Sequence, residues 1–250
     1  MSVSMRFLKS LLSIALLAAV TQVNAADEPA AKPLPRVLIL GDSISIGYTP
    51  FVQDMLKSEA EVVRPTRPNG NAENCSGTTL GVTAIDRWLK IGGGKWDVIH
   101  VNFGLHDLKR QKADGTASDD PNDPHQADPA AYEKNLRAIV ERLKATNAKL
   151  IFATTTPVPE ATLSPHRDPA DVVRYNDVAR TIAAENGMAV DDLYAFAKPQ
   201  LEKIQRPANV HFTDEGSKQL AAQVVASLRK ALKRDAASEK PQENKQPHVQ

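Results

Sequence analysis

The feature that most constrains the fold is an alternation of short apolar runs with long amphipathic patterns between residues 36 and 234. Amphipathic helical patterns lie at about 50–59, 79–90, 129–146 and 170–186, and a last one spans about 213–233. Strands that alternate with helices in this way predict a parallel sheet that is covered on both faces. The predicted strands are short and mostly aliphatic: VLIL (37–40), EVV (61–63), DVIHVNF (97–103), KLIFATT (149–155) and MAVDDL (188–193).

Two of the predicted helices have clear start signals. Thr49 precedes Pro50 and Asp128 precedes Pro129, so each pair places a capping residue before a proline at the first helical position. Between the third strand and the helix at Pro129, the segment 111–128 is rich in Asp, Pro and small polar residues. This composition predicts a long loop, and its position favours a lid over a site at the strand ends.

Length and composition bound the domain count and the class of partner. With 250 residues, of which 42% are hydrophobic, the chain can form one domain with a sizeable core. A formal net charge of +1 gives no basic field that would favour nucleic acid. Cys75 is the single cysteine and cannot form an internal disulfide, and we expect a small semi-buried side chain rather than a reactive thiol.

The N-terminal residues have the pattern of a secretory signal peptide at 1–25. Arg6 and Lys9 form a cationic region, 11–20 (LLSIALLAAV) is apolar, and 23–25 (VNA) resembles a cleavage site. An uncleaved membrane anchor is the alternative. The pattern predicts an exported protein, periplasmic or extracellular after cleavage near Ala25.

The remaining boundaries follow from composition. Residues 26–35 form a linker rich in Pro and Ala, 36–234 form the folded domain, and 235–250 are predicted to be a disordered tail because they have almost nothing to bury.

The stretch GDSIS (41–45) places a serine where the first strand ends. In a parallel α/β sheet, side chains at the carboxyl ends of the strands line the ligand crevice. Ser43 would expose its hydroxyl there, and its own backbone N–H could help to bind an oxyanion. Taken alone, Gly-Asp-Ser is more typical of a turn or a helix cap.

The other strand ends carry complementary chemistry. A loop of small residues, 71–79 (NAENCSGTT), follows the second strand, and 102–109 (NFGLHDLK) follows the third. Gly104 permits close approach there, and His106 can donate a hydrogen bond. His211 lies just before the last helix. A serine, a glycine-containing loop, a hydrogen-bond donor and a late histidine together favour acyl transfer.

These motifs, in this order, resemble the four main blocks of the SGNH, or GDSL, hydrolases. The resemblance covers about 36–234 and implies a flavodoxin-like three-layer α/β/α sandwich with a five-stranded parallel sheet. It implies a serine esterase with Ser43 as nucleophile, His211 as base, and the Gly77 N–H with His106 at the oxyanion. It implies no cofactor and no metal. Supporting roles are expected for Asp42, Ser76, Gly104, Asp107 and Asn209.

The sequence departs from the family pattern in three places. His106 occupies the position where the family has Asn, and an imidazole N–H can still donate to an oxyanion. Ala208 occupies the position of the usual acid, so Asn209, Asp214 or a backbone carbonyl would have to orient His211, or a Ser–His dyad would act alone. The glycine of the second block aligns at Gly77 or, in another register, at Ser76.

We therefore expect an exported monomeric esterase that removes short acyl groups, such as acetyl, from a small-molecule or polysaccharide ester. A lysophospholipase or thioesterase is one alternative, and a catalytically silent carbohydrate-binding scaffold is another. We expect no nucleic-acid partner and no membrane association after signal cleavage. A metal site is disfavoured because no H-x-H or H-E-x-x-H motif occurs, and the one D-x-H, at 123–125, lies in the polar loop. Arg167 or Arg174 could meet a polar substrate, and surface or structural salt bridges are the default expectation for both.

Overall fold

The computed structural model describes residues 33–238, and its centre is a five-stranded sheet with the order β2-β1-β3-β4-β5. Every neighbouring pair of strands is parallel. Each apolar run of the sequence contains one strand, so the predicted parallel sheet is confirmed. The strands are β1 (Arg36–Leu40), β2 (Glu61–Val63), β3 (Val98–Val101), β4 (Lys149–Ala153) and β5 (Ala189–Asp191).

Two of the three inner strands, β1 and β3, are buried on both faces. Val37 to Leu40 have no exposed surface, and every residue of β3 is buried. Leu38 lies opposite Ile99 in the register of this pair. Since all five strands are parallel, their carboxyl ends lie at one edge of the sheet, where the loops that follow them can form a common site.

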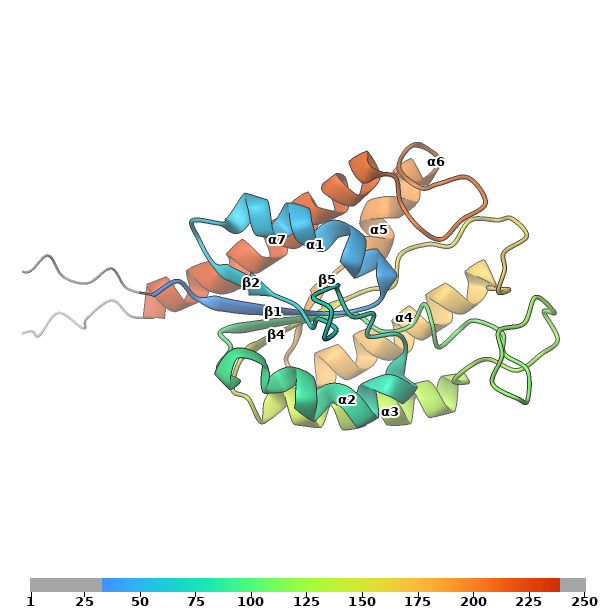
Figure 1. Cartoon of the computed structure of the whole chain (residues 1–250), viewed down its shortest axis with the longest axis horizontal. Helices are drawn as coiled ribbons and strands as arrows, with labels where there is room; N and C mark the ends of the chain where they lie inside the picture. Colours follow the sequence, from blue (N-terminus) through green and yellow to red (C-terminus); the bar gives the residue numbers. More distant parts are fainter. Residues whose placement is uncertain (1–32, 239–250) are drawn as a thin grey trace, which may run out of the picture. The chain divides into compact units, whose positions relative to one another are not determined.

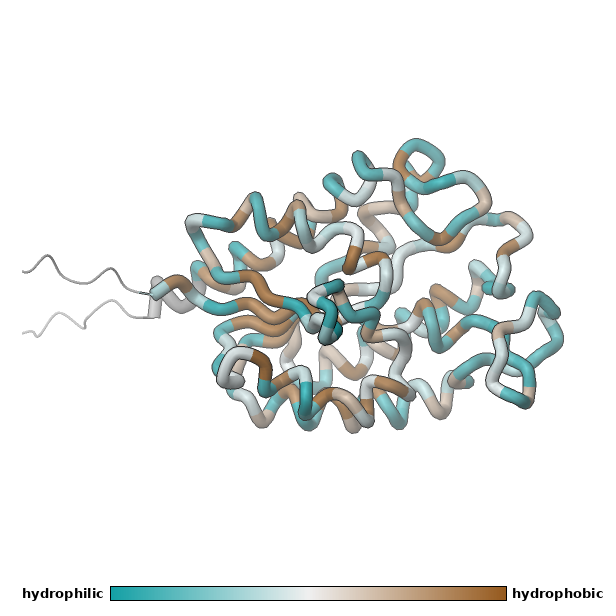
Figure 2. Tube along the Cα trace, in the orientation of Figure 1, coloured by the Kyte–Doolittle hydropathy of each residue, from teal (hydrophilic) through white to brown (hydrophobic). Residues whose placement is uncertain are grey.

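Helices cover both faces of the sheet (Figure 1). One face carries α1 (Ser43–Leu56) and α7 (Asp214–Ser238), which pack against each other, with α5 (Leu193–Ala197) beside α7. The other face carries α2 (Thr78–Leu89), α3 (Pro129–Lys144) and α4 (Pro169–Glu185). Figure 2 shows the hydrophobic residues concentrated along the strands. The predicted three-layer α/β/α sandwich is confirmed.

Helix α1 begins earlier than the sequence pattern predicts. The prediction that Thr49 caps a helix starting at Pro50 is wrong. Asp42 is the N-cap, and its Oδ1 accepts the Ile44 N–H at 2.8 Å. Pro50 lies inside the helix, where it removes one backbone hydrogen bond without ending the element. The earlier start makes Ser43 the first helical residue.

The predicted start of α3 is confirmed. Asp128 is the N-cap, Pro129 is the first helical residue, and the Asp128 side chain accepts the Ala131 N–H at 2.8 Å. Asp168 caps α4 in the same way before Pro169. Each aspartate satisfies an N–H group that has no partner within its own helix.

The C-terminal part contains short elements that the sequence pattern did not predict, namely α5, α6 (Leu201–Ile204) and two 3₁₀ turns, Ile91–Gly93 and Lys198–Gln200. Helix α7 continues to Ser238, so the predicted disordered tail does not begin at 235, because helical backbone extends four residues past Arg234. The predicted signal peptide, most of the predicted linker and residues 239–250 lie outside the described residues. Between residues 33 and 238, no helix has the length and hydropathy needed to cross a bilayer.

Candidate active site

Ser43 lies at the point where β1 passes into α1. Only Gly41 and Asp42 separate it from the end of the strand, so its side chain stands at the carboxyl edge of the sheet. Ser43 is partly exposed and therefore accessible to water. Its backbone N–H belongs to the first turn of α1 and has no acceptor within residues 33–238. The hydroxyl and the N–H are thus both available to a ligand.

His211 meets Ser43 from the opposite end of the chain. The His211 Nε2 atom lies 2.8 Å from the Ser43 Oγ atom, although 168 residues separate the two in sequence. His211 is partly exposed and lies three residues before the start of α7. Packing of α1 against α7 brings the two helix starts together. At this distance the imidazole can accept the hydroxyl proton.

Asn209 lies behind the His211 ring. Its Oδ1 atom is 2.8 Å from His211 Nδ1 and also accepts the His211 backbone N–H at 2.9 Å. An amide oxygen can only accept, so Nδ1 carries the proton and Nε2 presents its lone pair to Ser43. Ala208 adopts a left-handed conformation with φ 47°, which turns the chain so that Asn209 can reach the ring. Of the three groups considered from the sequence, Asn209 makes the contact.

The loop after β2 is fixed beside Ser43 by Arg64. This buried side chain donates from Nη1 to Ser45 Oγ at 3.2 Å and to Thr49 Oγ1 at 3.1 Å, both on α1. Its Nη2 donates to the Glu73 carbonyl at 2.9 Å. The Cys75 N–H also donates to the Gly41 carbonyl. These bonds hold the loop and the start of α2 against the turn that carries Ser43.

Gly77, rather than Ser76, has the free backbone N–H in this loop. The Ser76 N–H donates to Asn74 Oδ1 at 2.8 Å, whereas the Gly77 N–H has no acceptor within residues 33–238. Gly77 is the N-cap of α2, where N–H groups point away from the helix. A Cβ atom at Gly77 would lie 2.9 Å from the carboxylate oxygens of Asp107. The position therefore requires glycine.

Asp107 anchors the loop after β3 to α2. Its Oδ1 accepts the Thr78 N–H at 2.8 Å and the Thr78 hydroxyl at 2.5 Å. Burial raises the pKa of Asp107 to about 6. In the same loop, Gly104 has φ 147°, and a Cβ atom there would lie 2.3 Å from Thr155 Oγ1. Both residues position His106 rather than face a substrate.

His106 is partly exposed between Asp107 and the end of β3. Burial, reinforced by the nearby charges of Lys109 and Arg167, lowers the pKa of His106 to about 3. The imidazole is therefore neutral at physiological pH and carries one N–H. It can donate that N–H to an oxyanion, and its own protonation does not affect activity near neutral pH.

Burial also lowers the pKa of His211, followed by the charges of Arg206 and Arg167. The imidazole beside Ser43 is then unprotonated at neutral pH, as a general base must be.

Asp42 lies beneath the site and is only 1% exposed. Burial raises the pKa of Asp42 to about 6, although the Ile44 N–H and Arg167 oppose the effect. Asp42 acts on Ser43 by capping α1.

Arg167 lies at the site, as the alternative reading of its sequence position allowed. The default expectation of a salt bridge is wrong, because the side chain is 7% exposed and makes no ion pair within residues 33–238. Nε donates to the Leu105 carbonyl at 3.0 Å, and Nη1 donates to the Pro165 carbonyl at 3.2 Å. The guanidinium therefore packs against the loop that carries His106. Its position after β4 was the available signal, since strand ends build this edge.

The loop 111–128 is tied to the rest of the fold. Its His125 Nε2 lies 2.6 Å from Asp171 Oδ2 on α4, and Arg110 Nη2 donates to the same oxygen at 3.3 Å. The Ser118 hydroxyl bonds to Asp123. The predicted absence of secondary structure holds apart from isolated bridges. Among the described residues, no group of three or more His, Cys, Asp or Glu side chains is arranged to hold a metal ion.

Two other predicted residues are structural. Cys75 has no exposed surface, and burial raises the pKa of its thiol to about 12, so it is an inert core side chain. His100 is also fully buried, and its Nε2 lies 3.0 Å from Asp191 Oδ2. This pair joins β3 to β5 through the core.

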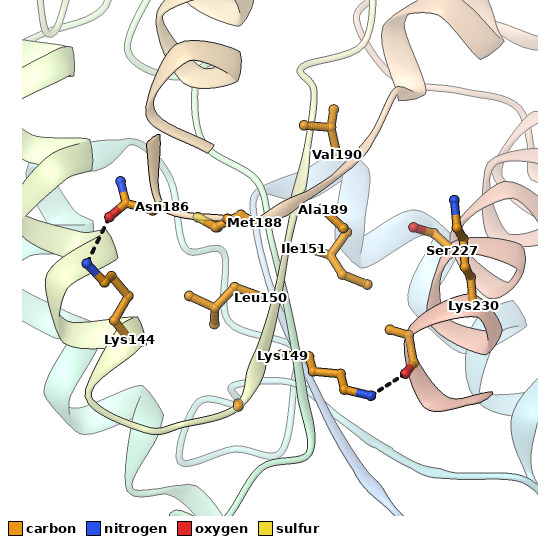
Figure 3. A pocket seen from close by; sticks show the side chains of 13 residues that line it. Lys144, Lys149, Leu150, Ile151, Asn186, Met188, Ala189, Val190, Ser227 and Lys230 are labelled. Atoms are coloured by element: carbon orange, nitrogen blue, oxygen red, sulfur yellow. Dashed lines mark hydrogen bonds between the residues drawn. The ribbon is translucent and has the colours of Figure 1, made fainter. Parts of the chain in front are cut away.

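An open groove leads away from His106. It has a volume of ≈ 580 Å³ and runs between the first turns of α2 and the loop 111–126, with Lys109 beside His106 in its wall. A second cavity, beneath Asp42 and Leu105, has a volume of only ≈ 10 Å³, about enough for one water. A third, of ≈ 670 Å³, lies at the amino ends of β4 and β5 against α7 (Figure 3). That cavity is at the opposite end of the strands from Ser43.

Comparisons with known proteins agree with this fold. The model of the GDSL-like lipase/acylhydrolase family matches residues 39–219. An acetyl xylan esterase structure has a TM-score of 0.60 at 19% identity and covers 77% of this chain and 99% of its own. A lipase/acylhydrolase from Enterococcus faecalis has a TM-score of 0.61 at 19% identity and covers 79% and 96%. An acetyl-xylooligosaccharide esterase from Geobacillus Stearmophilus gives 0.58 at 18%, with 79% and 94% covered. No curated protein matches the chain.

Proposed function

The chain belongs to the GDSL-like lipase/acylhydrolase family and is a carboxylic ester hydrolase, and on this premise we propose that it is an exported serine esterase that removes short acyl groups from carbohydrate. The observation that carries the proposal is the 2.8 Å contact between Ser43 Oγ and His211 Nε2, with Asn209 behind the ring. Nucleophile, base and orienting group then form a Ser–His–Asn triad.

In the first half of the reaction, Ser43 Oγ attacks the ester carbonyl carbon as its proton passes to His211 Nε2. The carbonyl oxygen becomes an oxyanion, which accepts hydrogen bonds from the Ser43 N–H, the Gly77 N–H and the neutral His106 ring. Each such donor is worth about 2.7–4 kcal/mol of transition-state stabilisation in a related oxyanion hole. The bond to the alcohol oxygen then breaks, and His211 returns its proton to that oxygen.

The second half removes the acyl group from Ser43. Water attacks the acyl carbonyl and gives a proton to His211 Nε2, through a second oxyanion in the same place. Collapse of this intermediate breaks the bond to Oγ, which regains its proton. Carboxylic acid leaves, and the enzyme returns to its starting state. Throughout, the Nδ1–H of His211 stays bonded to Asn209, and the amide stabilises the imidazolium by orientation rather than by charge.

The preference for short acyl groups rests on the shape of the site. The cavity beneath Asp42 and Leu105 has room for about one water, so no acyl tunnel enters the core at this point. The open groove beside His106 has polar walls, including Thr79, Gln111 and Gln126, that suit sugar hydroxyls. Two of the similar structures carry names that mention acetylated xylan or xylo-oligosaccharide, which favours the same substrate class.

Export is the part of the proposal that depends on residues 1–25. Their charged and apolar regions have the pattern of a cleaved leader. N-terminal sequencing of the protein recovered from periplasm or medium tests this part, and a mature N-terminus near Ala26 is expected. A protein that retains Met1 in the membrane fraction contradicts it.

Covalent labelling with a fluorophosphonate tests the mechanism. The wild type should react, and Ser43→Ala and His211→Ala should not. A wild type that is folded but unreactive would favour the silent scaffold instead. Hydrolysis of 4-nitrophenyl acetate, octanoate and palmitate then measures acyl length. A maximum at palmitate would favour the lysophospholipase or thioesterase alternative.

A further inference from the structure

The groove beside His106 contains a cation without a partner. Lys109 is half-buried in the groove wall, and its ammonium group makes no hydrogen bond or ion pair within residues 33–238. Burial lowers the pKa of Lys109, the charge of Arg167 lowers it further, and the charge of Asp107 opposes both effects. A half-buried ammonium with no anion in direct contact is costly, so an anionic ligand would be favoured at this position.

Arg167 supplies a second such charge, held against the carbonyl of Leu105, the residue before His106. Its two hydrogen bonds go to carbonyl oxygens and none goes to a carboxylate. Nη2 has no acceptor within the described part of the chain. Because its charge lowers the pKa of both His106 and His211, the guanidinium lies within electrostatic reach of both rings. A planar donor held in place by two carbonyls is preorganised for an oxyanionic group.

Arg206 adds a third positive charge beside His211. It is exposed, its Nε donates to the Phe212 carbonyl at 3.0 Å, and it makes no ion pair within residues 33–238. The carboxylates nearest to the site offset this field only in part, since Asp42 acts on Arg167 and Asp107 acts on Lys109 without forming an ion pair with either. Asp42 and Asp107 are buried, and each directs its Oδ1 at the start of a helix, α1 or α2. The face that a substrate meets is therefore positive, although the whole chain has a formal net charge of only +1.

We propose that the site selects esters whose alcohol part carries a negative charge, with Lys109 and Arg167 as the groups that bind this charge. The inference rests on the proposed function and names its substrate class as acylated acidic saccharides. An acetyl group has no ionisable atom, so the negative charge belongs to the sugar, which extends along the groove from His106. Polar side chains around Lys109 would contact the sugar hydroxyls: Ser76, Thr79, Thr83, Gln111 and Gln126.

The test compares esters that differ only in charge. Acetylated oligogalacturonate is matched with its carboxyl-reduced, neutral counterpart, and an acetylated sulfated oligosaccharide is matched with its desulfated form. For each pair we define the ratio of kcat/KM for the anionic ester to kcat/KM for its neutral counterpart. At low ionic strength this ratio should be at least ~10 for one pair, which is the size expected of one charge-assisted hydrogen bond. The pair with the larger ratio identifies carboxylate or sulfate as the group recognised. About 0.5 M salt should reduce the ratio, since screening weakens exposed charge pairs.

Substitutions assign the preference to the named residues. Lys109→Gln should reduce the ratio about fivefold, and Arg167→Gln should reduce it further where its thermal unfolding shows a folded protein. Lys112→Gln is the matched control, because Lys112 is an exposed lysine of the same loop outside the groove wall, and its ratio should equal that of the wild type. A ratio near 1 that is insensitive to salt and to Lys109→Gln overturns the inference. Failure of the wild type to hydrolyse 4-nitrophenyl acetate would instead overturn the proposed function itself.

Discussion

The side-chain oxygen of Asn209 accepts two hydrogen bonds from His211, one from the ring at 2.8 Å and one from the backbone N–H at 2.9 Å. The second bond closes an Asx turn, which fixes the Asn209 side chain independently of the imidazole ring. The first bond fixes the tautomer of the ring. A neutral residue thus performs the orienting role without placing a buried charge next to the base.

Substitution of Asn209 tests this role. Asn209→Ala removes both bonds, so the imidazole can rotate and change tautomer, and kcat should fall about 10²-fold, within the range that general-base catalysis contributes. Asn209→Asp keeps both bonds and should retain most of the activity. Steady-state kinetics with 4-nitrophenyl acetate measure both variants. Equal kcat for Asn209→Ala and wild type would mean that Ser43 and His211 act without an orienting group.

The pH dependence of kcat/KM should report the depressed pKa of His211. Activity requires the neutral imidazole, so the rate rises as pH increases through this pKa. Because burial and the charges of Arg206 and Arg167 lower the pKa, the midpoint should lie below the ordinary value of about 6.5. Asn209→Asp places a negative charge beside the ring and should move the midpoint upward, as should Arg206→Gln. A midpoint above 6.5 in the wild type would contradict this electrostatic account.

His106 should act by donating a hydrogen bond and not by titrating. His106→Ala removes an oxyanion donor and should lower kcat about 10²–10³-fold. His106→Asn restores a neutral donor of the kind found in the family and should recover much of the loss. Because burial holds the pKa of His106 at about 3, the pH profile of His106→Asn should match that of the wild type above pH 5. A missing acidic limb in the variant would assign the titration to His106 instead.

Adjacent residues 76 and 77 should respond in opposite ways. Gly77→Ala places a Cβ atom 2.9 Å from the Asp107 carboxylate, which displaces the N–H that we propose as an oxyanion donor, and kcat should fall at least 10-fold. Ser76 has φ 54°, a conformation that glycine adopts without strain, so Ser76→Gly should keep activity and raise the melting temperature slightly. Activity and thermal unfolding of both variants check the assignment. A loss at Ser76→Gly with none at Gly77→Ala would exchange their roles.

The sheet could be predicted from the sequence because buried parallel strands are continuous apolar runs, such as residues 37–40. The start of α1 could not, because two signals competed there. Thr49 and Pro50 form a stronger local start pattern than Asp42, but Asp42 follows the strand directly and its side chain reaches the Ile44 N–H. Tertiary position therefore decided the boundary. The short helix α5 was missed because five residues carry too little periodicity.

A site residue could be predicted where the sequence immediately around it marks its position in the fold. Ser43 and His211 lie at chain positions that the alternation marks as strand exit and helix entry, and Asn209 lies two residues before His211, the spacing of an Asx turn. For Arg167 the sequence offered only its position between β4 and α4, which does not separate a site residue from a salt bridge. Its burial depends on how the segment after β4 passes the Leu105 carbonyl, which no local pattern encodes. Lys109 is similar, since only the groove geometry distinguishes it from other exposed lysines.

Asp42 should make stability depend on pH in a direction opposite to that of most carboxylates. Burial raises its pKa from 3.8 to about 6 in the folded protein, so the folded state binds the proton more tightly than the unfolded state. The associated stability is fully present below pH 3.8 and is lost as pH rises through about 6. Asn at this position keeps the cap on α1 and cannot ionise. Asp42→Asn should therefore be more stable than the wild type at pH 8 by about 1–3 kcal/mol and nearly equal to it at pH 4.

Urea unfolding of both proteins at the two pH values measures the difference, with Ser43→Ala as a control that leaves Asp42 in place. The opposite result is an Asp42→Asn variant whose free energy of unfolding falls below that of the wild type at pH 8 but not at pH 4. That result would show that Arg64 and Arg167 stabilise the ionised carboxylate more than burial destabilises it.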